Sequence, residues 1–167
     1  MKRDRLAIVI PTYQRTDILR ENIARMADDL SALGVRVYIS DDSVTDDTEK
    51  LFEYPDHLKG PITYRRNKPP LGHDRNIIAS ACWPDADYVW ILNDKMWIIP
   101  GKLREVLEFL DHQDFIFLNS RTSISANIPE MTGEVSLSFI KEFLWHQTQT
   151  GATIFSRQVC LWVSNNH

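Results

Sequence analysis

The sequence predicts an α/β fold with a mainly parallel, mixed sheet and helices on both of its faces. Short apolar runs, such as residues 5–10 (RLAIVI) and 88–92 (YVWIL), have the length and composition of strands buried on both faces of a sheet. Segments with apolar residues at helical spacing lie between such runs, as in residues 19–33. Strands that alternate with helices imply right-handed βαβ crossovers, and therefore parallel pairing.

The order of these signals places each element along the chain. Strands are expected at residues 5–10, 35–39, 62–65, 88–92, 115–118 and 151–155. Helices are expected from Thr16 or Asp17 as the cap to Gly34, and at residues 74–82, 100–111 and 137–145. A short helix capped by Thr45 is also expected, with Asp46 and Asp47 in its first turn. Pro100 suits the first position of its helix, because the N–H that proline lacks is unpaired there anyway. Residues 119–133 are polar and irregular, so they are expected to form a long loop.

Length, charge and hydropathy limit the class of protein. The 167 residues suit a single domain, residues 1–167, with one core. The net charge of −4 argues against a nucleic-acid-binding surface, which would need a basic face. No apolar run approaches the roughly 18 residues of a membrane span, and no signal-peptide segment is recognisable. We therefore expect a cytoplasmic protein, or one peripheral to the inner face of the membrane.

Several common patterns of active sites are absent from the sequence. Cys82 and Cys160 lie far apart and outside any CxxC pair, which favours buried thiols in a reducing compartment. The five histidines show no i, i+4 pairing and no cysteine partner, so a zinc site is not expected. A GxSxG elbow, a Walker A loop and a GxGxxG fingerprint are also missing.

Unusual residues, most of them polar, follow three of the expected strands at the point where each strand ends. They are Pro11, Thr12 and Tyr13, then Asp41 and Asp42, then Asn93, Asp94 and Lys95. Because the carboxyl ends of parallel strands meet at one edge of a sheet, where open α/β sheets bind ligands, we expect these residues to lie together. Paired carboxylates there either accept hydrogen bonds from ribose hydroxyls and base N–H groups or hold a hard cation. For Asp41 and Asp42 a second interpretation stays open, in which they form only a turn and a helix cap.

The five tryptophans raise the question of stacking on carbohydrate. Trp90 and Trp97 fall in apolar runs and are expected in the core. Trp83 and Trp145 are better placed to face a groove.

Taken together, these segments resemble the amino-terminal, nucleotide-sugar-binding part of the family 2 glycosyltransferases, which have the GT-A fold. Residues 6–15 (LAIVIPTYQR) are similar to the family's first strand and loop, and residues 37–48 (VYISDDSVTDDT) to its second strand and acidic turn. Residues 62–76 (ITYRRNKPPLGHDRN) resemble the segment that ends in Leu-Gly and a polar helix start. Residues 87–94 (DYVWILND) stand where the family has its Asp-x-Asp strand. The resemblance covers residues 6–110, and residues 151–157 more faintly.

The resemblance implies a Rossmann-like nucleotide-diphospho-sugar transferase fold and a site for a nucleoside-diphosphate (NDP) sugar. The expected binding residues are Thr12, Tyr13 and Arg15 against base and phosphates, Asp41 or Asp42 at base or ribose, Asp74 and Arg75 flanking the nucleotide, Asp94 at ribose or metal, with Pro11, Asn93 and Lys95 completing the set. The family moves the sugar onto an acceptor hydroxyl, in inverting members with a carboxylate base. The implied function is hexosyl or related transfer to a glycan or lipid-linked acceptor in cell-surface polysaccharide synthesis.

The Asp-x-Asp motif is degenerate in this chain. Asp94 is its first acid, and Lys95 and Met96 stand where the following acids are expected. The resemblance implies Mg²⁺ or Mn²⁺ bound by these acids, and a lysine is not a metal ligand. Our hypothesis is that the Lys95 ammonium partly replaces the metal as a point charge on a phosphate oxygen. In the alternative, Lys95 points to solvent and the site is weak or inactive.

The catalytic base has no sequence signature. Carboxylates that fall in no recognisable pattern, and are expected to be solvated, are Asp111, Asp114, Glu130, Glu134 and Glu142. We also expect the chain to lack part of the acceptor-binding half, and the apolar surface left by an incomplete half would favour a homo-oligomer. The alternative function is therefore a catalytically inactive or truncated module that binds nucleotide-sugars or a partner.

A receiver-type phosphoacceptor domain also clusters acids and a lysine at strand ends. Its acidic pair would follow the first strand, where this chain has Pro11, Thr12 and Tyr13. That class is therefore set aside.

Overall fold

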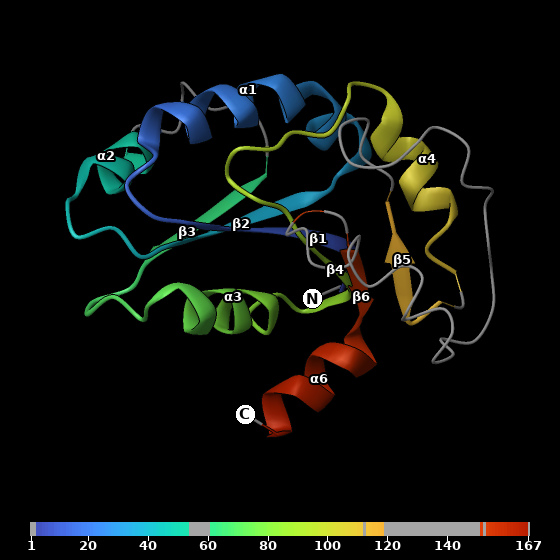
Figure 1. Cartoon of the computed structure of the whole chain (residues 1–167). Coiled ribbons are helices and arrows are strands. Elements are labelled where there is room, and N and C mark those ends of the chain that lie inside the picture. The colour runs from blue at the N-terminus through green and yellow to red at the C-terminus, as the bar shows by residue number, and fades with distance from the viewer. Residues whose placement is uncertain (1–2, 54–60, 112, 119–150, 152, 167) are drawn as a thin grey trace, which may run out of the picture.

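The computed structural model describes residues 3–53, 61–111, 113–118, 151 and 153–166. They form a six-stranded sheet in the order β3-β2-β1-β4-β6-β5 (Figure 1). The strands are β1 (Asp4–Thr12), β2 (Arg36–Asp41), β3 (Ile62–Arg66), β4 (Ala86–Ile91), β5 (Phe115–Phe117) and β6 (Thr153–Ser156). Strands β1 to β4 are parallel, whereas β6 is antiparallel to both β4 and β5. The predicted mainly parallel, mixed sheet is confirmed.

Helices cover both faces of the sheet, as predicted. They are α1 (Thr16–Leu33), α2 (Asp47–Glu53), α3 (His73–Ala81), α4 (Lys102–Glu108) and α6 (Arg157–Asn166). α1 and α4 lie over one face, and α3 and α6 lie over the other (Figure 1). None of the helices in the described ranges is both long and apolar enough to cross a bilayer.

The central strand β1 shows how the sequence builds these two layers. Because successive side chains of a strand point to opposite faces, Leu6, Ile8 and Ile10 pack into the larger core cluster, with residues of α1 and α4. Ala7 and Val9 pack into the smaller cluster on the other face, whose side chains include that of Cys160 from α6. Burying each large apolar side chain contributes about 1.5–3 kcal/mol. β1 is therefore the axis around which the carboxyl-terminal strand ends are positioned.

The predicted end of α1 is confirmed, whereas its predicted cap is not. Gly34 ends the helix as predicted, with a left-handed backbone (φ 64°) whose N–H reaches the carbonyl oxygens of Leu30 and Ser31. The predicted cap by Thr16 or Asp17 is wrong, because the N-cap residue is Arg15 and no side chain caps the helix. The Thr16 hydroxyl instead lies 2.9 Å from the hydroxyl of Thr48 in α2.

The helix predicted at residues 100–111 is shorter than expected. It begins at Lys102 because Gly101 has a left-handed backbone (φ 81°) and its N–H donates to Asp29 Oδ2, 2.6 Å away. Pro100 therefore lies in the turn before the helix.

Two further elements at the carboxyl-terminal end were placed wrongly or missed. The last strand begins at Thr153, and α6, which the sequence did not predict, follows it directly. Five consecutive apolar residues at 159–163 hide the helical period of α6, since an unbroken run fits a strand equally well. The helix predicted at residues 137–145 and the loop predicted at 119–133 lie outside the described residues.

Candidate functional site

The carboxyl ends of the parallel strands converge at one edge of the sheet, as predicted. Thr12 at the end of β1 is in register with Asp41 at the end of β2, and Asp41 with Arg66 at the end of β3. The pairing continues past the strand, since the Asp42 N–H donates to the Thr12 carbonyl oxygen at 2.9 Å. The N–H of Leu92, after β4, donates to the Val9 carbonyl oxygen at 2.9 Å. The segment 93–95 therefore emerges beside the end of β1.

Asp94 is buried at this edge and connects three elements. Its Oδ1 accepts from Arg15 Nη1 at 2.8 Å, and its Oδ2 accepts from Thr12 Oγ1 at 3.0 Å. Its backbone oxygen accepts from Asn22 Nδ2 of α1 at 2.9 Å. The Asp94 side chain is 2% exposed, whereas that of Arg15 is 41% exposed. A buried carboxylate is thus joined to a cation that still reaches the surface.

The turn after β4 presents Lys95 at the surface. The Lys95 N–H donates to Asn93 Oδ1 at 2.9 Å, and the Met96 N–H donates to the Asn93 carbonyl oxygen at 2.9 Å. These bonds form a tight turn, in which the side-chain and backbone oxygens of Asn93 both accept from backbone N–H groups. The Lys95 side chain is exposed, and no side-chain partner for it lies among the described residues.

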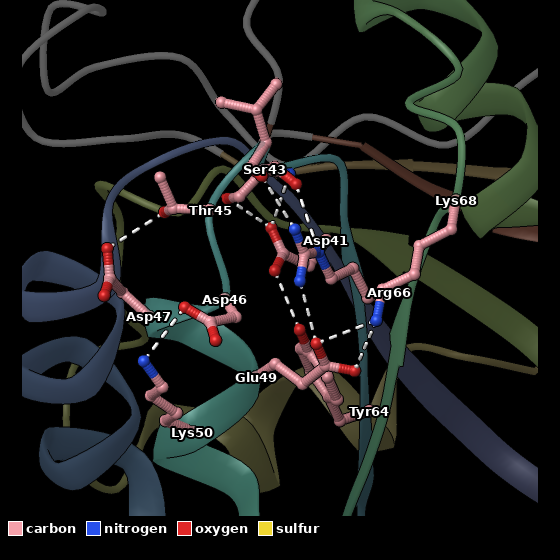
Figure 2. A network of polar contacts seen from close by, with 11 residues as sticks. Asp41, Ser43, Thr45, Asp46, Asp47, Glu49, Lys50, Tyr64, Arg66 and Lys68 are labelled. Atoms are coloured by element: carbon pink, nitrogen blue, oxygen red, sulfur yellow. Dashed lines mark hydrogen bonds and ion pairs between the residues drawn. The ribbon is translucent and has the colours of Figure 1, made fainter.

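Asp41 is used inside the protein. Its Oδ1 accepts from the N–H and the hydroxyl of Ser43, and its Oδ2 accepts from the Tyr64 hydroxyl at 2.8 Å. The bond to the backbone N–H two residues ahead forms an Asx-turn, the geometry that the turn interpretation expects. Contact of Asp41 with a ligand stays a prediction. Burial, and then the hydrogen bond to Asp41, raise the pKa of the Tyr64 hydroxyl. Figure 2 shows Tyr64 pointing at Asp41 from the neighbouring strand.

A cluster of charged side chains near Asp41, formed by Glu49, Arg66 and Lys68, holds the loop between β2 and α2 in place (Figure 2). Glu49 pairs with Arg66 at 2.8 Å and with Lys68 at 3.0 Å. The hydrogen bond from Arg66, followed by that from Lys68, lowers the pKa of the Glu49 carboxyl. Arg66 also donates to the backbone oxygens of Ser43 and Val44. This cluster therefore holds β3 against the loop.

Asp42 organises the loop between β3 and α3. Its carboxylate accepts from the backbone N–H groups of Leu71 at 2.8 Å and Gly72 at 2.7 Å. It also accepts from Asn67 Nδ2 at 3.0 Å. Asp42 is buried, and these contacts hold the segment that leads into Asp74.

The remaining predicted residues lie on the outside of this edge. Tyr13 is 52% exposed, next to Gln14, whose N–H donates to Ser43 Oγ at 2.7 Å. Pro11 is half-buried. Asp74 and Arg75 are exposed on the first turn of α3, and no described contact joins them to Asp94.

Several residues that build the site were missed by reasoning from the sequence. Asn22 is a buried asparagine within the apolar stripe of α1, and a polar residue at a core position was the available signal. Ser40 and Asn76 exchange two hydrogen bonds, at 2.7 and 3.0 Å, beneath the strand ends. Single serines and asparagines in a sequence carry no mark of such pairing.

The described carboxylates do not fit a divalent cation. No group of three potential ligands among histidine, cysteine, aspartate and glutamate occurs in the part of the chain that the structure describes. Both oxygens of Asp94 are engaged, one of them by a guanidinium, and the oxygens of Asp41 and Asp42 accept from N–H and O–H groups. A cation next to the Arg15 guanidinium would be repelled.

The carboxylates considered as catalytic bases lie elsewhere or outside the described residues. Asp111 pairs with Arg5 at 3.0 Å, near the start of β1 and far along the sheet from Asp94. Asp114 accepts from the Ser156 hydroxyl at 2.9 Å. The other three, Glu130, Glu134 and Glu142, fall outside the described residues.

The tryptophans divide differently from the prediction. Trp90 is in the core as predicted and donates to the Gly151 oxygen at 2.9 Å. Trp97 is 46% exposed, and the Arg25 guanidinium lies 4.4 Å from its ring centre, so its predicted place in the core is wrong. An apolar run that follows a strand end can turn outward, which its composition does not reveal. Trp83 lines a cavity of about 350 Å³ at the amino-terminal ends of β1 and β4, opposite the candidate site. Trp145 lies outside the described residues.

Comparisons with known proteins agree with the fold. The family model of glycosyl transferase family 2 matches residues 7–160. The abequosyltransferase RfbV of Salmonella typhimurium (strain LT2) is 31% identical over 128 residues, which are 75% of this chain and 38% of that protein. TarS 1-349 of S. aureus has a TM-score of 0.72 at 17% identity, over 97% of this chain and 49% of the TarS 1-349 chain.

A second solved structure has the same fold. The mannosyltransferase PcManGT from Pyrobaculum calidifontis, in complex with GDP-Man and Mn²⁺, has a TM-score of 0.65 at 14% identity, over 98% of this chain and 47% of its own. The chain thus spans less than half the length of each of these relatives. These likenesses confirm the predicted GT-A fold, and the family model matches nearly the whole sequence. The chain belongs to glycosyl transferase family 2.

Proposed function

We propose that this chain binds an NDP-sugar at the carboxyl-terminal edge of its sheet and transfers the sugar to an acceptor hydroxyl. The observation that carries the proposal is the cluster of Thr12, Arg15 and Asp94, which places a surface-reaching cation at the ends of β1 and β4. Ligands of open α/β sheets bind at this edge. Family membership makes an NDP-sugar the first ligand to test, since TarS was solved with UDP-GlcNAc and PcManGT with GDP-Man.

The geometry refines the roles of the predicted residues. Tyr13 offers an exposed ring for the base, beside a loop that Ser43 holds in place. The Asp41 and Asp42 carboxylates already accept hydrogen bonds from the protein, so their main contribution is to shape the walls around the nucleotide. Arg15 and Lys95 provide the positive charge for the diphosphate.

The proposed setting of the reaction is cell-surface polysaccharide synthesis. The curated relative is named an abequosyltransferase, and its name supports a sugar as the transferred group. We place the reaction in the cytoplasm or at the inner face of the membrane, with a glycan or lipid-linked acceptor. The described residues single out no carboxylate as the base that would deprotonate the acceptor.

A second candidate function is a nucleotide-sugar-binding module without transferase activity. It is favoured by the interrupted Asp-x-Asp motif and by the positions of Asp111 and Asp114, which pair with Arg5 and Ser156 away from Asp94. Such a module would bind the nucleotide-sugar but release no NDP from it.

Calorimetric titration with UDP, GDP, CDP and dTDP tests the binding step. We expect saturable binding of at least one of them, weakened by Tyr13→Ala. The matched control is Trp162→Ala, which removes an exposed aromatic side chain (64% exposed) on α6, at a distance from the edge. Absence of binding by all four nucleotides would overturn the proposal. Release of NDP from the matching NDP-sugar with an acceptor extract separates the transferase from the binding module.

A further inference from the structure

The residue that stands first in the degenerate Asp-x-Asp motif serves as the anchor of an arginine. Asp94 Oδ1 lies 2.8 Å from Arg15 Nη1, and its Oδ2 lies 3.0 Å from the Thr12 hydroxyl. We propose that Arg15, held in place by Asp94, takes the role of a divalent cation and binds the diphosphate of the donor directly. This inference rests on the proposed function.

The Arg15 guanidinium has the donors that this role needs. A guanidinium carries five N–H donors in a planar fork that matches two phosphate oxygens at once. The hydrogen bond to Asp94 uses an N–H of Nη1, and the side chain remains 41% exposed. Because the Asp94 carboxylate is buried, it fixes the position of the guanidinium without competing for solvent-side ligands. Arg15 is therefore preorganised for an anion.

The sum of charges also favours this arrangement. Two acids with a divalent cation give a net charge of zero next to the diphosphate. In this chain Asp94, Arg15 and the exposed Lys95 together give one net positive charge. The positive charge offered to the diphosphate is thus no smaller than in a metal-loaded pair of acids. Lys95, which has no anchor among the described residues, acts as the second and weaker cation.

Asp94 is accordingly a positioning residue in this scheme. It is tied to Thr12 through its side chain and to Asn22 through its backbone, so the anchor belongs to the framework of β1 and α1. Asp94→Asn should lower the affinity for NDP, but less than Arg15→Ala, because the guanidinium remains and loses only its charged anchor. Adding Asp94→Asn to Arg15→Ala should change the affinity little, because the guanidinium that Asp94 orients is then already absent.

The decisive experiment is calorimetry of the intact chain with the best-binding nucleotide of UDP, GDP, CDP and dTDP, in EDTA and in Mn²⁺. We expect the affinity of the wild type to differ by less than about twofold between the two conditions, since no cation takes part. Arg15→Ala should weaken NDP binding in EDTA by about tenfold or more, the size of a hydrogen bond to a charged group. Arg15→Ala should change the affinity for the corresponding nucleoside little, because the nucleoside lacks the diphosphate.

Matched variants separate the role of Arg15 from general damage. Arg20→Ala removes a surface arginine of α1 that pairs with Asp17, and it should leave NDP affinity unchanged. Arg15→Lys keeps the charge and should retain part of the affinity, and circular dichroism checks that each variant is folded. Lys95→Ala should weaken binding less than Arg15→Ala.

The outcomes distinguish this inference from the function on which it rests. NDP binding that requires Mn²⁺, or that Arg15→Ala leaves intact, would overturn the inference while the donor site stands. Binding of no nucleotide by the wild type would overturn the donor site, and the inference with it.

Discussion

Arg15 Nη1 and Asp94 Oδ1 lie 2.8 Å apart although 79 positions separate them in the sequence. The pair joins the loop after β1 to the turn after β4, and only its arginine reaches the surface. Removing the arginine would destabilise the folded state, because the buried Asp94 carboxylate would then lack a counter-charge. This ion pair therefore connects the stability of the edge to its capacity to bind an anion.

The first prediction concerns the stability that the pair provides. Arg15→Ala should lower the free energy of unfolding by about 1–3 kcal/mol, less than for a fully buried pair because Arg15 is partly exposed. In an Asp94→Asn background the same substitution should cost much less, because a neutral amide needs no counter-charge. Urea denaturation of the four proteins measures the coupling. Equal costs in the two backgrounds would show that the two side chains do not stabilise each other.

Asp42 gives a prediction about the loop that leads into α3. Asp42→Ala removes the acceptor of the Leu71 and Gly72 N–H groups and should lower the free energy of unfolding by about 1–3 kcal/mol. Water can reach part of this loop and replace some of the lost hydrogen bonding, which limits the effect. Hydrogen exchange of these two amides should become faster in the folded protein. Asp28→Ala, at an exposed position of α1, is the control and should change neither quantity. Unchanged exchange in Asp42→Ala would mean that other contacts hold the loop.

Glu49 gives a prediction about pH. Its pKa is lowered from the ordinary value of 4.5 by the hydrogen bond from Arg66 and then that from Lys68. A lowered pKa in the folded state contributes stability above pH 4.5, which is lost as the pH falls through the lower folded value. Glu49→Gln should therefore be less stable than wild type at pH 7 and approach it in strong acid. The effect is small because the Glu49 side chain is partly exposed (31%), and Glu108→Gln serves as the control for a surface glutamate. A stability difference that does not change with pH would contradict this role of the ion pairs.

The Cys160 thiol should react only slowly with alkylating reagents in the folded protein. Burial raises the pKa of its thiol to about 11, so at pH 8 only about a thousandth of it is thiolate, against roughly a quarter of an unperturbed thiol. Mass spectrometry after iodoacetamide treatment of a Cys82→Ser variant follows Cys160 alone. We expect slow labelling in buffer and fast labelling in urea. Similar rates in the two solvents would show that the thiol is accessible in the native state.

The arrangement of strands was accessible from the sequence because each strand is a short apolar run that ends on polar residues. The convergence of Thr12, Asp41 and Asp94 at one edge followed from parallel pairing alone. The resemblance to family 2 glycosyltransferases then indicated which ligand to expect there. The match of the family model to residues 7–160 confirmed that the chain belongs to this family.

The partners of the side chains were not accessible in the same way. Nothing in the local sequence reveals that Arg15 will pair with Asp94, because the contact depends on where two distant loops emerge. The sequence leaves open whether Asp41 and Asp42 contact a ligand or only shape a turn, whereas the structure shows their carboxylates accepting from Ser43, Tyr64 and the loop after β3. Hydrogen bonds of this kind require the tertiary structure.

The most direct test of the account is a crystal structure of the chain grown in EDTA with its preferred NDP. We predict diphosphate oxygens within about 2.7–3.2 Å of the Arg15 guanidinium nitrogens, with the pair to Asp94 intact and the base beside Tyr13. A nucleotide bound at another face, or Arg15 turned away from the diphosphate, would contradict it.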